Sequence, residues 1–292
     1  MQYQDRDWEI IDYQGYILKD AGERDFRGPA PETLKDNQYF VCLGAAQTFG
    51  CFCEKPYPNL LQERLKFQGL NLGFPGAGPS FFLKEKPLLK YINNAKFAIV
   101  QVMSGRSESN SLFESGGLEY LTKLSDGAKI GATQAYQELF KKYDKNYVKD
   151  IVAETRYNWI NNFQKLLQAI QVPKILFWFS TRESYYQEKY TNAHSLLGRF
   201  PQLVNTKMLN QIKKYSHEYV ECISGRGMPQ LLISRFTYKP ITLDPLKMRE
   251  DLRSSDSSQK TFNNYYPSPE MHIDAAIALE KICKKYSNFI KT

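Results

Sequence analysis

The sequence contains little of what metal-binding, secreted and membrane proteins need. It has three histidines, and its five cysteines have no regular spacing, with Cys51 and Cys53 too close together for a zinc knuckle. We therefore expect no metal site, reduced thiols and a cytoplasmic protein. No apolar run approaches the roughly 18 residues of a membrane span. Residues 1–14 lack the basic and apolar regions of a signal peptide, so none is expected.

The sequence also lacks a block of charges of one sign. The formal net charge is +8 and the pI about 9.0, yet basic residues alternate with acidic ones, as in Lys84-Glu85-Lys86. This pattern predicts a solvated basic surface and an anionic small ligand rather than nucleic acid. Aromatic residues make up 14% of the chain, with 20 Tyr, and they either line a cleft or pack helices onto a sheet.

Five apolar runs predict buried strands, at residues 40–43, 70–74, 96–103, 174–180 and 219–223. Helical patterns lie between them, near residues 59–65, 80–94, 133–171 (two helices), 206–216 and 273–289. Alternating strands and helices indicate a parallel sheet with crossover helices on both faces. We therefore predict a three-layer α/β/α sandwich, flavodoxin-like, with a mostly parallel sheet of about five strands.

We expect one domain over residues 38–292, because no linker interrupts the α/β alternation. Residues 1–37 are expected to be an irregular lead-in. Insertions are expected near residues 112–132 and 185–205, and a loop region over 224–264. The first three strands each end in a turn rich in Gly and Ser, and right-handed crossovers bring such turns to one edge of the sheet.

The order of these turns resembles that of the SGNH (GDSL) hydrolase superfamily. That family has a nucleophile turn after its first strand, an oxyanion-hole Gly after its second, a third polar turn, and a His before its last helix. Residues 44–50 (GAAQTFG) match the first block, and residues 71–76 (NLGFPG) match the second. Ser104–Ser107 lies where the third belongs, and His272 where the His belongs.

The chain departs from that family at several functional positions. Ala46 stands at the nucleophile position, and Ala45 replaces the preceding Asp. Ser107 stands where an Asn would be, and Pro269 where the Asp that orients His272 would be. The whole chain also resembles an uncharacterised bacterial domain family that shares GAAQTFG, VQVMSGRSxSNS and YYPSPEMH. The resemblance therefore implies the fold but not hydrolysis by a serine.

The expected chemistry rests on two other features. His272 is the candidate general base, because an imidazole titrates near neutral pH, and Glu270 is the candidate group that orients it. Ser104–Ser111 combines hydroxyls, Arg106 and backbone N–H groups, which suits an oxyanion such as phosphate or sulfate. Thr48 is the one hydroxyl left in the first turn. The other candidate ligand-binding residues are Gly44, Gln47, Asn71, Gly76, Ser104, Gly105, Ser107, Asn110 and Arg182.

Three functions remain open from the sequence. The first is a transferase that moves an acyl or sulfuryl group to a hydroxyl of a carbohydrate or similar acceptor. Its donor would be a CoA thioester or a sulfonucleotide, with no permanently bound cofactor. The second is a non-catalytic protein with this fold that binds a glycan or an anion. The third is a hydrolase that uses Thr48 with His272.

Overall fold

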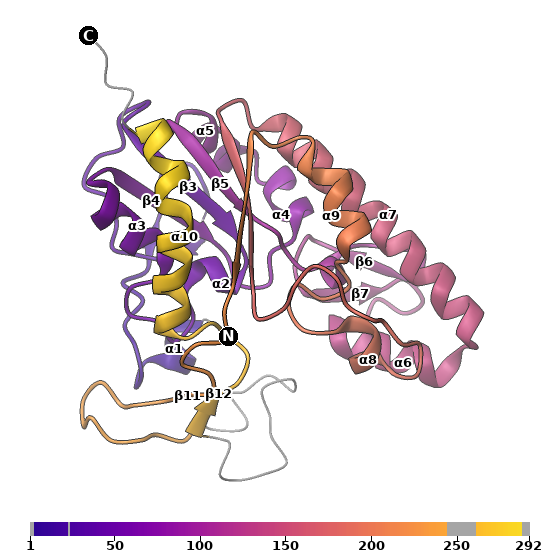
Figure 1. The fold of residues 1–292 in the computed structure, drawn as a ribbon. Helices are drawn as coiled ribbons and strands as arrows, with labels where there is room; N and C mark the ends of the chain where they lie inside the picture. The colour runs from indigo at the N-terminus through magenta and orange to yellow at the C-terminus, as the bar shows by residue number, and fades with distance from the viewer. Residues whose placement is uncertain (1–2, 23, 244–260, 288–292) are drawn as a thin grey trace.

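A five-stranded parallel sheet forms the centre of the molecule (Figure 1). The computed structural model describes residues 3–22, 24–243 and 261–287. The strands follow the spatial order β10-β9-β5-β3-β4 and are β3 (Tyr39–Gly44), β4 (Gln68–Gly73), β5 (Phe97–Gln101), β9 (Lys174–Ser180) and β10 (Glu218–Ile223). All four pairings are parallel. Counted in chain order, this is the flavodoxin-like arrangement, so the predicted fold class is confirmed.

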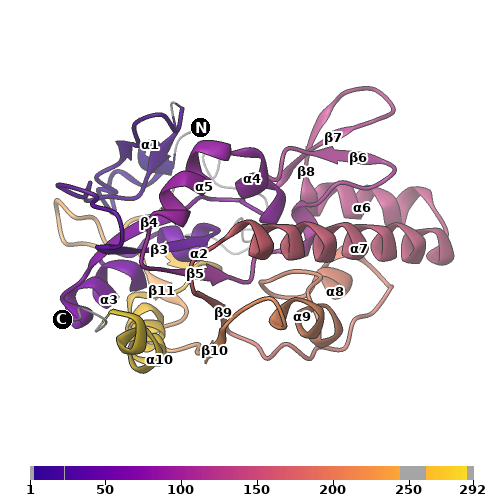
Figure 2. The ribbon, with the colours of Figure 1, turned by 90° about the horizontal axis from the view of Figure 1, so that it is seen from above.

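Helices cover both faces of this sheet (Figure 2). Val41 and Leu43 face one layer, whereas Phe40 and Cys42, which alternate with them, face the other. The first layer contains α4 (Pro79–Lys84), α5 (Lys86–Asn93), α7 (Lys145–Ala169) and α9 (Thr206–Lys213). The second contains α3 (Tyr57–Leu65) and α10 (Pro269–Ser287). Because both faces are covered, β3, β5 and β9 are buried at every residue and read as continuous apolar runs.

The long helix α7 extends past the sheet and carries a smaller lobe at its far end (Figure 1). The lobe contains β6 (Phe113–Ser115), β7 (Tyr120–Lys123), β8 (Lys129–Gly131), α6 (Ala132–Lys142) and α8 (Ala193–Leu197). The residues expected as insertions, 112–132 and 185–205, fall here. Gly117 has φ +85, and a Cβ there would lie 2.1 Å from the backbone N of Phe81. The β6–β7 loop therefore packs directly on α4, next to the sheet.

The N-terminal lead-in is folded against the carboxyl edge of the sheet. It contains α1 (Tyr3–Asp7), β1 (Tyr16–Ile17) and β2 (Asp25–Phe26). Its first part packs with α2 (Ala46–Phe49) in a fourth cluster, whereas Tyr16 and Phe26 pack with the first layer. The short strands β11 (Gln230–Leu231) and β12 (Phe262–Asn263) pair with each other. Tyr13 lies edge-on to Phe49 in the fourth cluster. Of the expected loop region 224–264, residues 244–260 lie outside the described residues.

The last helix begins earlier than the sequence predicted. We expected it from about residue 273, but α10 begins at Pro269. The Ser268 hydroxyl accepts a hydrogen bond from the Met271 N–H, and a proline fits the first helical position because no N–H is needed there. His272 therefore lies within the first turn of a helix rather than in a loop at a strand end.

Two features of the described residues concern membranes and thiols. None of the helices in ranges 3–22, 24–243 and 261–287 is long and apolar enough to cross a membrane. The five cysteines are buried and carry free thiols. Burial raises the pKa of Cys53 and Cys222 to about 12, so these thiols stay protonated at neutral pH.

Candidate functional site

The ends of β3, β4 and β5 meet in one cavity, which we call the inner pocket. The strand order changes direction between β3 and β5, and ligands of open α/β sheets bind in the crevice at such a switch point. The inner pocket is lined by Ala45, Ala46, Gln47, Gly76, Ala77, Ser104, Arg106, Ser107, Glu119, Phe200, Gln202, Tyr265 and Tyr266. All three turns that the sequence indicated thus contribute to it.

Two glycines shape the turns around the inner pocket. A Cβ at Gly44 would lie 2.1 Å from Thr48 Oγ1, so only glycine lets α2 begin this close to the strand end. Gly76 has φ +81, which glycine adopts without strain. The cavity volume is ≈ 20 Å³, room for about one water molecule or one hydroxyl group.

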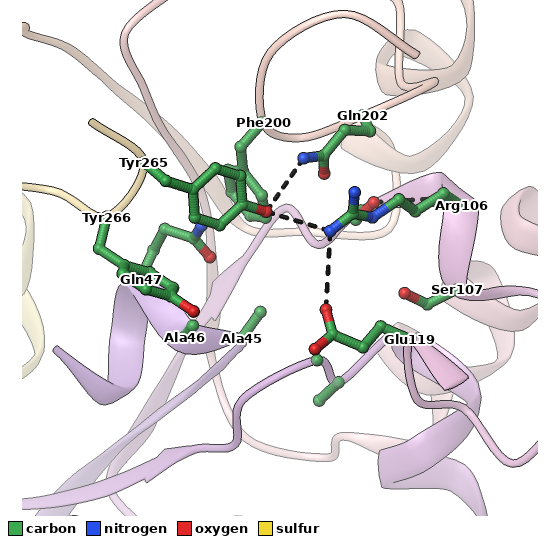
Figure 3. A pocket seen from close by; sticks show the side chains of 13 residues that line it. Ala45, Ala46, Gln47, Arg106, Ser107, Glu119, Phe200, Gln202, Tyr265 and Tyr266 are labelled. Carbon is green, nitrogen blue, oxygen red and sulfur yellow. Dashed lines mark hydrogen bonds and ion pairs between the residues drawn. The ribbon is translucent and has the colours of Figure 1, made fainter. Parts of the chain in front are cut away.

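Arg106 is held by three side chains, two of which, Tyr265 and Glu119, are drawn in Figure 3. It is 4% exposed. Its Nη1 donates to Thr133 Oγ1 at 2.6 Å, and its Nη2 donates to the Tyr265 hydroxyl at 3.2 Å and lies 3.6 Å from Glu119 Oε2. The same Tyr265 hydroxyl accepts from Gln202 Nε2 at 3.0 Å. The contacts form a continuous chain from Gln202 through Tyr265 and Arg106 to Glu119.

The pairing of Arg106 with Glu119 changes the expected chemistry of the Ser104–Ser111 turn. A buried guanidinium that already faces a carboxylate offers little net charge to an anion. Ser104 Oγ accepts from the Arg106 N–H. Asn110 Oδ1 accepts from two N–H groups of the β6 hairpin, and Asn110 does not line the inner pocket. Figure 3 shows the Ser107 hydroxyl pointing toward the pocket. The inner pocket suits a neutral polar group better than an oxyanion.

Two buried amide oxygens line the inner pocket without a hydrogen-bond partner in the described part of the chain. They are Gln47 Oε1 and Gln202 Oε1, on side chains from residues that are 2% and 4% exposed. A buried acceptor that finds no donor costs about 1–3 kcal/mol. Because both residues line a cavity, a ligand with hydroxyl or N–H donors would satisfy them.

His272 lies in the core instead of on the pocket wall, so its placement corrects the expected location. It is fully buried, its Nδ1 accepts from the Tyr57 N–H at 3.1 Å, and its ring packs against Tyr57 and Phe179. Burial, with a smaller effect of the Arg27 charge, lowers the pKa of His272 to about 3. Its Nε2 has no hydrogen-bond partner among the described residues. This environment fixes a neutral imidazole away from the inner pocket.

The other two candidate catalytic residues also lie outside the inner pocket. Thr48 is fully buried and its hydroxyl donates to Gln101 Oε1 at 2.7 Å, which in turn accepts from the Ala45 N–H. Glu270 lies against Gly227, whose Cβ would come within 2.1 Å of Glu270 Oε2. Thr48, Glu270 and His272 are therefore not assembled into one site.

Four of the remaining candidates hold the structure around the inner pocket. Asn71 Nδ2 donates to Thr48 O, and the Gly105 N–H donates to Gln202 O. Arg182 donates to the carbonyls of the 199–204 segment, and Gly44 permits the first turn. Of the candidates named from the sequence, Gln47, Gly76, Ser104, Arg106 and Ser107 line the inner pocket.

Eight lining residues were not among the predicted site residues: Ala45, Ala46, Ala77, Glu119, Phe200, Gln202, Tyr265 and Tyr266. Glu119 comes from the expected insertion at 112–132, and Phe200 and Gln202 from the one at 185–205. The two tyrosines precede α10 in the YYPSPEMH stretch, where only the histidine and glutamate were singled out. The sequence signal that could have indicated these residues is that long polar insertions follow strand ends, where binding residues often lie.

A much larger cavity, which we call the wide cleft, shares a wall with the inner pocket. Its volume is ≈ 820 Å³. The shared wall consists of Gln47, Arg106, Phe200, Gln202, Tyr265 and Tyr266. From there the wide cleft continues past Ser180 and Thr181 at the end of β9, past α8, and along Met228, Leu232 and Phe262. A cavity of this size accommodates an organic molecule of several hundred daltons.

Comparison with known sequences gives a family. The profile of a domain of unknown function (DUF6473) matches residues 1–115 and 136–242. The chain belongs to this family. No curated protein sequence matches it.

Several solved structures resemble the chain at low identity. A catalytic mutant of Axe2, an acetylxylan esterase from Geobacillus stearothermophilus, is 10% identical, with 89% of this chain and 99% of that chain covered and a TM-score of 0.40. A carbohydrate esterase family 2 enzyme from Corynascus thermopiles (Myceliophthora fergusii) is 9% identical over 90% and 70%, with a TM-score of 0.42. A lipolytic protein of the G-D-S-L family from Desulfitobacterium hafniense DCB-2 is 12% identical over 86% and 99%, with a TM-score of 0.31. At these values the likeness says nothing about the chemistry of this chain.

Proposed function

We propose that the protein binds a carbohydrate without hydrolysing it. The sugar would lie at the shared wall, with one of its hydroxyl groups in the inner pocket. The observation that carries this proposal is the pair of buried amide oxygens of Gln47 and Gln202, which lack donors in the described structure. Sugar hydroxyls supply such donors, and the rings of Tyr265 and Phe200 offer faces on which a pyranose packs.

The lining of the inner pocket also supports binding without hydrolysis. Ala46 contributes a methyl group, at the position where the SGNH resemblance would place a nucleophile. No histidine is among the described residues that line the pocket, and the neutral His272 lies in the core. The serine–histidine pairing that the SGNH resemblance would call for is therefore not formed by the described residues that line this pocket.

The test is a binding experiment with the purified full chain. The chain is screened on a glycan array, and each hit is titrated against the Gln47→Leu variant. We expect affinity to fall at least about tenfold, because a lost hydrogen bond to a buried acceptor costs about 1–3 kcal/mol. The melting temperature should stay equal or rise, because the variant removes a buried acceptor that has no donor in the apo protein.

The matched control is Gln171→Leu, since Gln171 is exposed just before β9, at the opposite end of that strand from the inner pocket. It should bind as the unchanged chain does. If no glycan binds, or if Gln47→Leu binds as tightly as the unchanged chain, carbohydrate binding at this wall is rejected.

Group transfer to a sugar hydroxyl is the second candidate function. It is favoured by the shared wall, because a donor in the wide cleft would lie next to an acceptor at the inner pocket. The Glu119 carboxylate, in place of His272, would accept the proton of the acceptor hydroxyl as its oxygen bonds to the acyl or sulfuryl group. The bond from that group to the donor would break, and the CoA thiolate or the nucleotide phosphate would leave. Mass spectrometry of a glycan hit incubated with acetyl-CoA or a sulfonucleotide tests this. An unmodified glycan in both cases rejects transfer and leaves the binding proposal intact.

A further inference from the structure

The wide cleft has an unusual charge for a cavity of its size. None of the described residues that line it is Asp or Glu, although 31 of the 292 residues of the chain are acidic. Arg106, Arg199 and His194 do line it. Because none of the described lining residues is a carboxylate, the positive charge of Arg199 is not offset within the cavity, and it attracts an anionic ligand.

Arg199 is the cation of the wide cleft that is available to a ligand. Arg106 faces Glu119, and neighbouring Arg182 donates to backbone carbonyls. The Arg199 side chain is exposed and forms no ion pair within residues 3–22, 24–243 and 261–287. Only its backbone carbonyl is engaged, by Arg182 Nε at 3.0 Å. Its guanidinium can therefore form paired hydrogen bonds with a phosphate.

Other groups of the wide cleft match the remaining parts of a nucleotide. Thr181 places a hydroxyl at the carboxyl end of β9, where parallel sheets bind ligands. Phe262 and Tyr265 are only partly buried and present aromatic rings to the cavity. An aromatic face stacks on a nucleobase, at a gain of about 1–3 kcal/mol per base. The volume of ≈ 820 Å³ accommodates a nucleoside with two phosphates.

We propose that the wide cleft is a nucleotide site in which Arg199 binds a phosphate group and the aromatic rings at Phe262 and Tyr265 receive the base. The site adjoins the carbohydrate position at the inner pocket, and the two share Tyr265 on their common wall. Binding of the nucleotide does not depend on whether a group is transferred, and it stands if the carbohydrate proposal fails.

The probe is adenosine 3′,5′-bisphosphate, the portion that CoA shares with a 3′-phosphorylated sulfonucleotide. It is titrated into the full chain by calorimetry, beside adenosine, which has the base but no phosphate. We expect adenosine and the Arg199→Gln variant each to show at least about tenfold weaker binding, because a hydrogen bond to a charged group is worth about 1.5–3 kcal/mol. Binding should weaken as salt increases, since an exposed cation is screened.

Three controls make the result decisive. Arg199→Lys keeps the charge and should bind between the unchanged chain and Arg199→Gln, while Lys86→Gln on α5 removes an exposed cation outside the cleft and should change nothing. Arg199→Gln should lose the nucleotide and bind a glycan hit as the unchanged chain does, because Arg199 lines the wide cleft but not the inner pocket. No binding up to about 1 mM, equal binding of adenosine, or an unchanged affinity of Arg199→Gln would each overturn the site.

Discussion

Arg106 Nη2 lies 3.6 Å from Glu119 Oε2, and the two side chains are 4% and 12% exposed. The two residues come from different parts of the fold, the turn after β5 and the loop before β7. Their opposite charges compensate each other inside a site that is otherwise neutral. This pairing decides which ligands the inner pocket accepts.

Replacing Glu119 with Gln should therefore change both stability and ligand preference. Removing one member of a buried ion pair costs about 3 kcal/mol, because the other charge stays desolvated. The Arg106 charge would then favour an anion, so sulfate should raise the melting temperature of Glu119→Gln more than that of the unchanged chain. The measurements are urea unfolding and thermal shift with sodium sulfate.

Glu138→Gln is the matched control, because Glu138 pairs with Lys123 at 2.6 Å on the surface and is 42% exposed. Exposed pairs contribute little, so this variant should unfold almost as the unchanged chain does. Equal effects of the two variants would mean that the Arg106–Glu119 pair does not neutralise the site.

Gly76→Ala should strain the turn and disturb Glu119 together. A non-glycine residue in the left-handed region costs about 1–2 kcal/mol. The new Cβ would also lie 2.9 Å from Glu119 Cγ, so that side chain must move. We expect reduced stability in urea and weaker carbohydrate binding in calorimetry.

Gly127→Ala separates these two effects. Gly127 has φ +74 but nothing within 4 Å of its Cβ position. It should lose a similar free energy of unfolding and keep its ligand affinity. A loss of affinity in Gly127→Ala as large as in Gly76→Ala would show that strain alone explains the effect.

The neutral His272 should make the protein less stable in acid. Its folded pKa of about 3 lies below the unfolded value of 6.5, so the unfolded chain binds a proton that the folded chain does not. The free energy of unfolding should therefore fall as the pH drops from about 6.5 toward 3, by about 4 kcal/mol over the whole range. His272→Asn keeps an acceptor for the Tyr57 N–H and should lack this part of the pH dependence in urea unfolding.

His217→Asn is the control, because His217 Nδ1 also accepts a backbone N–H, from Lys174, but the residue is exposed. It should leave the pH dependence in place. Ligand binding by His272→Asn should match that of the unchanged chain. A loss of binding or turnover in a folded variant would support the hypothesis that His272 is a general base.

Glu108 should have the opposite effect on stability. It is 1% exposed, accepts from Ser80 Oγ and Asn162 Nδ2, and burial raises its pKa to about 7 from 4.5. The protonated Glu108 contributes fully to the free energy of unfolding below pH 4.5. This contribution decreases by about 3 kcal/mol as the pH rises to about 7. Glu108→Gln should remove this decline, whereas Glu114→Gln, at an exposed position of β6, should not. A decline that persists in Glu108→Gln would assign it to another group.

The sequence predicted the sheet well because its strands are covered on both faces. Continuous apolar runs such as 174–180 coincide with observed strands, and β9 spans the same residues. The turns that follow the strands were also found, since small residues must lie where chain segments approach closely. These signals are local, so they can be read without knowing the rest of the chain.

The environment of each side chain could not be read in the same way. Whether Arg106 is available depends on Glu119, and nothing in the pattern of residues 112–132 shows that their loop reaches the sheet edge. Whether His272 titrates depends on its burial against Tyr57 and Phe179. Both questions are settled by tertiary contacts between segments distant in sequence.

The inner pocket is formed by segments that are far apart in the sequence. Its wall takes residues from the turn after β3, from both insertions, and from the segment before the last helix, so the pocket is complete only when all of these segments are in place. Contacts between segments distant in sequence form late in folding, because the entropy cost of closing a long loop comes before the contacts that stabilise it. A ligand of this pocket would bind the finished fold alone, and so would serve as a probe of the last step of its folding.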